Sequence, residues 1–237
     1  MTYARSYTPP RMPPVASVDV PASSANLGSG FDSFAVALSL KLRAELWAAD
    51  EAGIVLNARG EGAPRDDEPA GENLLIRAFR EGLRVSSAPG AAAWRIDVSS
   101  MIPSARGLGS SAAAIVAGVV LGAAVGRRTV EADELLALAA RLEGHPDNVA
   151  AALYGGFTIA LAQNERIALR RFRVPEAWIP VAFIPQRESR TSEMRAALPQ
   201  TVPPQMVVPD QTIVPSQLTS PSQSELEPQV ASSPVVH

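Results

Sequence analysis

The chain has 237 residues, a formal net charge of −3, no cysteine and 46% hydrophobic residues. The lack of cysteine excludes a disulfide framework and a thiolate metal site, and it favours an intracellular location. The sequence contains neither a basic stripe nor an apolar run of roughly 18 residues, so it gives no support to nucleic-acid binding or to a membrane span. We therefore expect a cytoplasmic protein of one large or two small domains, without nucleic acid or membrane as a partner.

Two segments of alternating apolar and polar residues open the chain. Val15–Val20 and residues 34–42 both have the period of two that is typical of strands, and the second predicts a strand with one core-facing side. The small residues between them, Pro21–Asp32, predict a loop. Asn26 and Asp32 have two interpretations there: turn chemistry, which the loop alone favours, or polar groups presented to a small ligand.

The next segments alternate between strands and helices. A turn at Asp50–Gly53 leads into a strand at Ile54–Ala58, a helix with Asn73 as its N-cap follows, and Trp94–Ser99 again alternates as a strand. Two further helices are predicted at Ala112–Val125, which is apolar on every side, and at Glu131–Glu143. Strands and helices thus come in pairs, which predicts an α+β sandwich rather than a doubly wound sheet.

A glycine turn, Ile102–Ser111, comes directly before the apolar helix. Gly107 and Gly109 allow tight backbone bends, and the free N–H groups at a helix start suit a phosphate; a helix merely capped by serine is the alternative. The only lysine is Lys41, which excludes a Walker A loop, and the helix that follows excludes a dinucleotide fingerprint.

The stretch Glu143–Asn148 also has two interpretations, and the local sequence favours neither of them. Gly144 can end one helix, and Asp147 or Asn148 can cap the next one, Val149–Tyr154. Alternatively, the carboxylates and the amide supply oxygen ligands for Mg²⁺ beside phosphates. His145 by itself is more often a structural histidine than a ligand.

The last segments before the tail are short. Phe157–Leu161 and Val181–Ile184 are predicted as apolar strands. Thr191 and Arg195 lie four residues apart, so a short helix would place them on one face, where they could bind a carboxylate or simply face solvent.

Four stretches occur in the order and spacing of homoserine kinases: Pro21–Asp32, Pro103–Ser111, Glu143–Asn148 and Thr191–Pro199. The chain resembles this family over about residues 15–203, and the second stretch is shared with the wider superfamily of galactokinase, homoserine, mevalonate and phosphomevalonate kinases. The resemblance implies an α+β fold with a ribosomal-protein-S5-like N-terminal domain and only the start of a ferredoxin-like C-terminal domain. It also implies ATP-dependent phosphorylation of the homoserine hydroxyl, a step toward threonine.

The resemblance implies a role for individual residues as well. The ATP phosphate loop is Pro103, Ser104, Ala105, Arg106, Gly107, Leu108, Gly109, Ser110 and Ser111; the Mg²⁺ ligands are Ser111 and Glu143; the homoserine pocket is Asn26, Asp32, His145, Thr191 and Arg195. Asp32 would bind the substrate ammonium and Arg195 its carboxylate, and Asn148 and Asp32 are the implied catalytic residues. Asn148 stands near the position where some relatives carry a basic Asp, so we expect the hydroxyl proton to go to the phosphate while Asn148 orients the substrate.

The C-terminal part departs from the family. Homoserine kinases continue well beyond this point, whereas Pro203–His237 is rich in Pro, Gln and Ser, with glutamines at residues 205, 211, 217, 223 and 229. The prolines disfavour a β-helix, so we expect a disordered tail. We expect this tail to be a repeated segment that follows a truncated kinase, either through a fusion or because the reading frame ran into it. The expected organisation is a disordered segment 1–14, an ATP-binding domain 15–160, a partial second domain 161–202 and the tail 203–237.

Two functional hypotheses follow, a homoserine kinase impaired by the missing half, or a weak or inactive remnant that binds only nucleotide or a partner. The oligomeric state that we consider is a homodimer. Under either hypothesis, Asn26, Asp32, residues 107–111 and residues 143–148 should ring one cavity, with the start of the apolar helix aimed into it.

Overall fold

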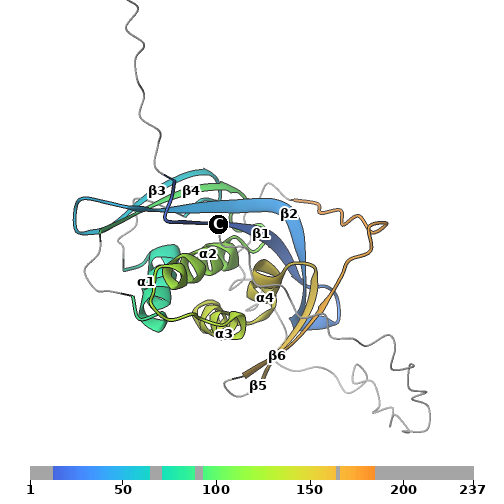
Figure 1. Cartoon of the computed structure of the whole chain (residues 1–237). Helices are drawn as coiled ribbons and strands as arrows, with labels where there is room; N and C mark the ends of the chain where they lie inside the picture. The colour runs from blue at the N-terminus through green and yellow to red at the C-terminus, as the bar shows by residue number, and fades with distance from the viewer. Residues whose placement is uncertain (1–12, 65–70, 89–92, 164–165, 185–237) are drawn as a thin grey trace, which may run out of the picture.

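A mixed sheet and four helices make up the described part of the chain. The computed structural model describes residues 13–64, 71–88, 93–163 and 166–184; residues 1–12, Thr191, Arg195 and the tail 203–237 lie outside them. The strands are β1 (Ala16–Asn26), β2 (Gly30–Ala48), β3 (Gly53–Glu61), β4 (Ala93–Met101), β5 (Phe157–Gln163) and β6 (Arg166–Phe172), and the helices are α1 (Leu74–Val85), α2 (Ser110–Ala124), α3 (Ala132–Glu143) and α4 (Asp147–Tyr154). In Figure 1 the helices lie beneath β1–β4, which confirms the predicted α+β class.

The long strand β2 organises the sheet. The strand order is β3-β4-β2-β5-β6, and β1 pairs with β2 on its other edge. All pairs are antiparallel except β3 with β4, which run parallel because α1 crosses over between them. The sheet continues past residue 160, since β6 pairs with β5 from Phe157 opposite Phe172 to Gln163 opposite Arg166.

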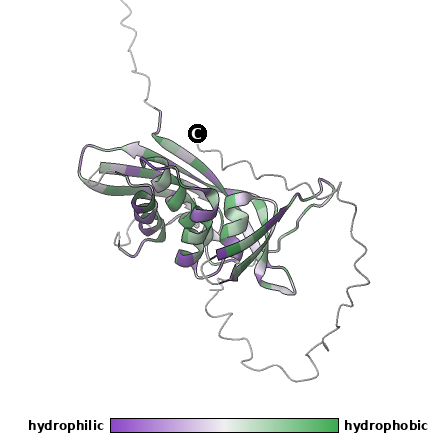
Figure 2. Cartoon of the chain, turned by 60° about the horizontal axis from the view of Figure 1, so that its bottom comes forward, coloured by the Kyte–Doolittle hydropathy of each residue, from purple (hydrophilic) through white to green (hydrophobic). Residues whose placement is uncertain are grey.

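Helix α2 forms the centre of the core. Every residue from Ala112 to Gly122 is buried, which explains why the sequence is apolar on all sides of this helix. Its glycines allow α1 to lie directly against it, because a Cβ on Gly118 would come within 2.4 Å of the Leu75 carbonyl oxygen and one on Gly122 within 2.3 Å of that of Phe79. Figure 2 shows the hydrophobic residues along the strands and the hydrophilic ones toward the outer parts of the helices. No helix among the described residues is both long and apolar enough to cross a bilayer.

Several local predictions are confirmed. Asn73 caps α1, since its Oδ1 accepts hydrogen bonds from the backbone N–H groups of Leu75 and Ile76. The helix predicted at Glu131–Glu143 is α3, which begins one residue later at Ala132, and Gly144 ends that helix with a φ of 97°. The strands predicted at residues 54–58 and 94–99 lie within β3 and β4.

The prediction of a loop at Pro21–Asp32 is wrong. β1 continues to Asn26 and β2 begins at Gly30, so only a three-residue turn separates them. The small residues mark a close approach instead: Ser23 is fully buried, and a Cβ on Gly109 would lie 2.3 Å from its Oγ. Small side chains in a strand can therefore reflect crowding by another segment rather than a loop.

The prediction of one core-facing side for residues 34–42 is correct only for the second half of the segment, where Leu38 and Leu40 pack against the core. Leu42 and Ala35 are buried, whereas Phe34 and Val36 are only partly buried. The β1–β2 register shifts between Pro21 and Ser23, so the pairing of β2 with β1 is irregular between these two halves of the predicted strand.

No strand occurs at Val181–Ile184, contrary to the prediction, and the sequence analysis missed β6 at Arg166–Phe172. The apolar side chains of the first segment are exposed, with Phe183 94% accessible, so they have no neighbouring strand among the described residues. Residues 173–184 follow β6 as the orange segment of Figure 1. An apolar run forms a strand only where an edge is available to pair with it.

Candidate active site

The glycine turn before α2 has the backbone of an anion-binding loop. Ala105, Gly107 and Gly109 have positive φ values of 51°, 69° and 68°. The N-cap of α2 is Gly109, no side chain caps this helix in the described structure, and both serines lie inside it, so the alternative of a serine cap is wrong. The first N–H groups of α2 therefore have no intrahelical or side-chain cap acceptor, and they carry the positive end of the helix dipole.

Ser23 of β1 anchors this turn. Its backbone N–H donates to the Leu108 carbonyl at 3.1 Å, and Leu108 is itself buried. Its Oγ accepts from Asn148 Nδ2 at 3.0 Å, so β1, the glycine turn and the start of α4 meet at one side chain. The close packing against Gly109 fixes the distance between the turn and Asn148.

Ser111 and Glu143, the two residues implied as metal ligands, contact each other. Ser111 Oγ donates to Glu143 Oε1 at 2.6 Å, joining the first turn of α2 to the last residue of α3. Burial raises the pKa of Glu143, the hydrogen bond from Ser111 and the nearby His145 lower it, and Asp147 raises it. A hydroxyl and a carboxylate oxygen at this separation, beside an anion-binding turn, fit the hard oxygen donors that Mg²⁺ prefers.

The turn between α3 and α4 carries three more polar side chains. Helix α4 begins at Asp147 with Pro146 as its N-cap and without a side-chain cap, so the predicted capping by Asp147 or Asn148 is wrong. Instead, Asp147 Oδ1 lies 2.5 Å from His145 Nδ1 and accepts the backbone N–H of Asn148 at 2.7 Å. The buried carboxylate thus holds the imidazole in one orientation.

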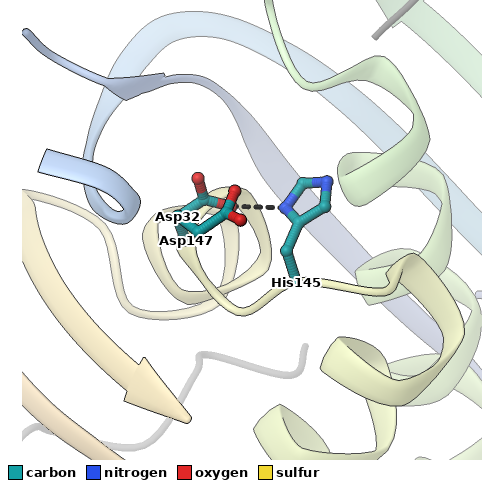
Figure 3. Close-up of side chains that lie close together, drawn as sticks. All are labelled: Asp32, His145 and Asp147. Atoms are coloured by element: carbon teal, nitrogen blue, oxygen red, sulfur yellow. Dashed lines mark hydrogen bonds and ion pairs between the residues drawn. The ribbon is translucent and has the colours of Figure 1, made fainter. Parts of the chain in front are cut away.

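Asn26 and Asp32 close the β1–β2 hairpin. Asn26 Oδ1 accepts the Asp32 backbone N–H at 3.0 Å, and both residues have positive φ values, 70° and 54°. Turn chemistry therefore accounts for Asn26. The Asp32 side chain instead faces His145 and Asp147, with one ligand atom of each of the three within 4.8 Å of the others (Figure 3).

These contacts bring three of the four sequence stretches together, and Thr191 and Arg195 of the fourth lie outside the described residues. Ser23 was not singled out from the sequence, and Asp147 was considered there only as a helix cap or as one of several oxygen ligands for Mg²⁺. Both lie inside the matched stretches: Ser23 is one of a run of small residues, and Asp147 separates His145 from Asn148. Only the fold shows that their side chains are buried and turned inward.

Comparison with known proteins agrees with this geometry. Residues 73–156 match the family described as GHMP kinases N terminal domain. A homoserine kinase of Bacillus cereus is 38% identical over 187 residues, covering 79% of this chain and 60% of that protein. One of Streptococcus equi subsp. zooepidemicus is 41% identical over 183 residues, covering 77% and 60%.

The solved structure of a homoserine kinase from Cytophaga hutchinsonii aligns with a TM-score of 0.65 and 26% identity, covering 80% of this chain and 62% of that one. The chain thus spans about 60% of the length of the relatives that it matches. Residues 73–156 thus match the GHMP kinase N-terminal domain, and this chain is similar to homoserine kinases over 79% of its length.

Proposed function

We propose that residues 103–111 bind the phosphates of ATP and that Ser111 and Glu143 hold its Mg²⁺. The positive φ values of the turn and the helix start at Ser110 support the phosphate assignment, since such backbones direct N–H groups toward an anion. When bound, Mg²⁺ supplies charge neutralisation at the phosphates. The observation that carries the proposal is the 2.6 Å contact of Ser111 with Glu143 beside this turn.

The proposed reaction moves the γ-phosphoryl group of ATP to the hydroxyl of L-homoserine, giving ADP and O-phospho-L-homoserine on the way to threonine. The O–P bond to the leaving ADP breaks, a new O–P bond forms at the hydroxyl oxygen, and the hydroxyl proton goes to the phosphate. The names of the homologues support this substrate, and their greater length makes it a proposal for the present chain.

The chain's own contribution is positioning, which dominates catalysis of phosphoryl transfer. Asn148 cannot act as a base because an amide does not accept a proton at neutral pH, so we assign it to orienting the hydroxyl. Its hydrogen bond to Ser23 supports this role by fixing its side chain next to the glycine turn. Asn26, Asp32 and His145 are the described part of the proposed homoserine pocket, and Thr191 and Arg195 complete it.

The second candidate is a chain that binds nucleotide with little turnover. The exposed apolar side chains of Trp178, Ile179 and Phe183, between 71% and 94% accessible, favour it, because in a complete pocket we expect such groups to be covered. We expect turnover below the roughly 1–100 s⁻¹ of ordinary kinases. The proposed location is the cytoplasm, which the lack of cysteine supports. The proposed assembly is a homodimer, which sedimentation would test.

An ADP-release assay with homoserine and with other small alcohols tests the proposal. We expect release above the acceptor-free rate with homoserine, loss of this increment in Glu143→Gln, and no change in Asp50→Asn, an exposed residue in the β2–β3 turn. Mg²⁺-dependent ATP binding without any acceptor-dependent release would establish the second candidate instead. A chain that neither binds ATP nor releases ADP contradicts both.

A further inference from the structure

An apolar groove lies where β5 and β6 meet the segment that follows them, which is orange in Figure 1. The groove has a volume of about 760 Å³, and its walls include Phe157 and Phe172 on the strands and Trp178 and Ile179 on the segment. Phe157 and Phe172 lie opposite each other on β5 and β6, with ring centroids 5.9 Å apart. The Trp178 backbone N–H donates to the Pro175 carbonyl oxygen at 2.9 Å, and this turn helps to hold the second wall.

The aromatic walls of the groove are exposed in the described structure. The side chains of Phe172, Trp178 and Ile179 are 48%, 71% and 81% accessible. Contiguous exposed apolar side chains of this kind mark a binding surface. Grooves lined by aromatic rings bind extended, proline-rich segments, which need neither a helix nor a strand and lose little conformational entropy on binding. The groove therefore fits an extended segment that contains proline.

The surroundings of the groove are basic. Arg173 lines the groove itself, and the chain from Arg166 to Ile184 carries arginines at residues 166, 170, 171 and 173 against the single carboxylate of Glu176. In the described part of the sheet β6 is an edge strand that pairs with β5 alone. A second copy that added its own β6 to this edge would place arginines against arginines, which is unfavourable. The charge thus favours an occupant that carries a negative charge.

The tail of this chain has the composition that such a site requires. Residues 203–237 contain seven prolines, three acidic residues and no lysine or arginine. Within the tail, residues 206–214 read Met-Val-Val-Pro-Asp-Gln-Thr-Ile-Val, so a proline and an aspartate stand between apolar residues. Residues 185–205 connect this stretch to Ile184, close in sequence to the groove wall. An unstructured chain of that length spans about 25 Å and gives an effective concentration of about millimolar.

We propose that residues 206–214 of this chain bind in the groove, with Asp210 beside Arg173 and the flanking apolar residues against the aromatic walls. Binding covers apolar side chains that would otherwise promote association between molecules. The inference does not depend on the proposed kinase reaction, because ADP release reports on the active site and not on this groove.

Quenching of Trp178 fluorescence by acrylamide in the full chain tests whether the groove is covered. Trp47 and Trp94 also fluoresce, so each protein is measured with and without Trp178→Phe, and the difference is the signal of Trp178. Asp210→Arg and Arg173→Glu each bring like charges together in the proposed complex. The double variant restores a pair of opposite charges with the signs exchanged, which isolates the interaction of the two residues.

Two charge reversals elsewhere are the matched controls. Glu227→Arg changes an acidic residue of the tail outside residues 206–214, and Arg127→Glu changes an exposed residue in the turn between α2 and α3. Neither reversal should alter the quenching of Trp178.

We expect Trp178 of the unmodified protein to be quenched about threefold less efficiently than free N-acetyltryptophanamide, at every protein concentration. Asp210→Arg and Arg173→Glu should each raise the quenching about two- to threefold, and the double variant should return it to the original value. Quenching of the unmodified protein as efficient as that of the free compound overturns the inference, and so does a single variant without effect or a double variant without recovery. Protection that grows with protein concentration, together with dimers in sedimentation, also overturns it, because the occupant would then be a second copy.

Discussion

Ser111 Oγ on α2 donates a 2.6 Å hydrogen bond to Glu143 Oε1 on α3, although 32 residues separate them in the chain. The contact joins the first turn of one helix to the last residue of the next, at the open N-terminal end of α2. It places a hydroxyl and a carboxylate where the phosphates of a nucleotide would meet the helix dipole.

Removing the hydroxyl should therefore separate nucleotide binding from its metal dependence. We expect Ser111→Ala to reduce the enhancement of ATP binding by Mg²⁺ about tenfold or more, since one oxygen donor is lost. The measurement is ATP affinity with Mg²⁺ and with a chelator. Ser39→Ala, at an exposed position on β2, should keep the full enhancement, and an unchanged enhancement in Ser111→Ala would remove this residue from the metal site.

Glu143 should make stability depend on pH in a defined direction. Burial raises its pKa above the ordinary 4.5, so the folded state holds the proton more tightly than the unfolded chain. The tighter binding of this proton therefore stabilises the folded state fully below pH 4.5, and this stabilisation is lost as the pH rises through the pKa that Glu143 has in the folded state. Glu143→Gln, which stays neutral, should raise the melting temperature near pH 7.

This gain should shrink to nothing near pH 4, where the carboxyl group of the unmodified protein is also neutral. Glu51→Gln, in an exposed turn, should show no such difference between the two pH values. Thermal melts of the three proteins at both pH values provide the check. A gain that persists at low pH would mean that something other than the charge of Glu143 is responsible.

The two glycines of the turn before α2 should respond differently to alanine. Gly107 and Gly109 both have positive φ values, so each substitution costs about 1 kcal/mol of strain. A Cβ on Gly107 meets nothing within 4 Å, whereas one on Gly109 comes 2.3 Å from Ser23 Oγ. Urea unfolding should show a loss of about 1 kcal/mol for Gly107→Ala and about 2–4 kcal/mol for Gly109→Ala. Equal losses of unfolding free energy in the two variants would show that β1 moves away from the added methyl group at no cost.

Gly118→Ala should destabilise the fold even though alanine favours helices. Propensity alone predicts a gain of about 1 kcal/mol, but the new Cβ would lie 2.4 Å from the Leu75 carbonyl oxygen of α1. The cost of overpacking, about 1–3 kcal/mol, should exceed this gain, and α1 should move away from α2. Ala124→Gly, at the exposed end of the same helix, should show the ordinary sign, a loss of about 1 kcal/mol. Both are measured by denaturant unfolding, and a more stable Gly118→Ala would refute the close approach.

The sequence by itself determined the helices and most strands. Asn73, Glu131 and Gly144 act through backbone groups within a few residues, and the apolar run of α2 requires burial wherever it lies, so local rules were sufficient. The glycine turn and the order of the matched stretches indicated the family for the same reason, because each motif is read within one segment.

Only the tertiary structure decided which residues of different segments meet. Ser23 looked like part of a loop until Gly109 was seen packed against it, and Val181–Ile184 looked like a strand although no strand pairs with it in the described structure. Asp147 looked like a helix cap, yet its carboxylate turns inward to His145 and Asp32. These outcomes depend on the register shift in β1–β2 and on the helices lying against the sheet, and such long-range packing leaves no periodic signal in any single segment.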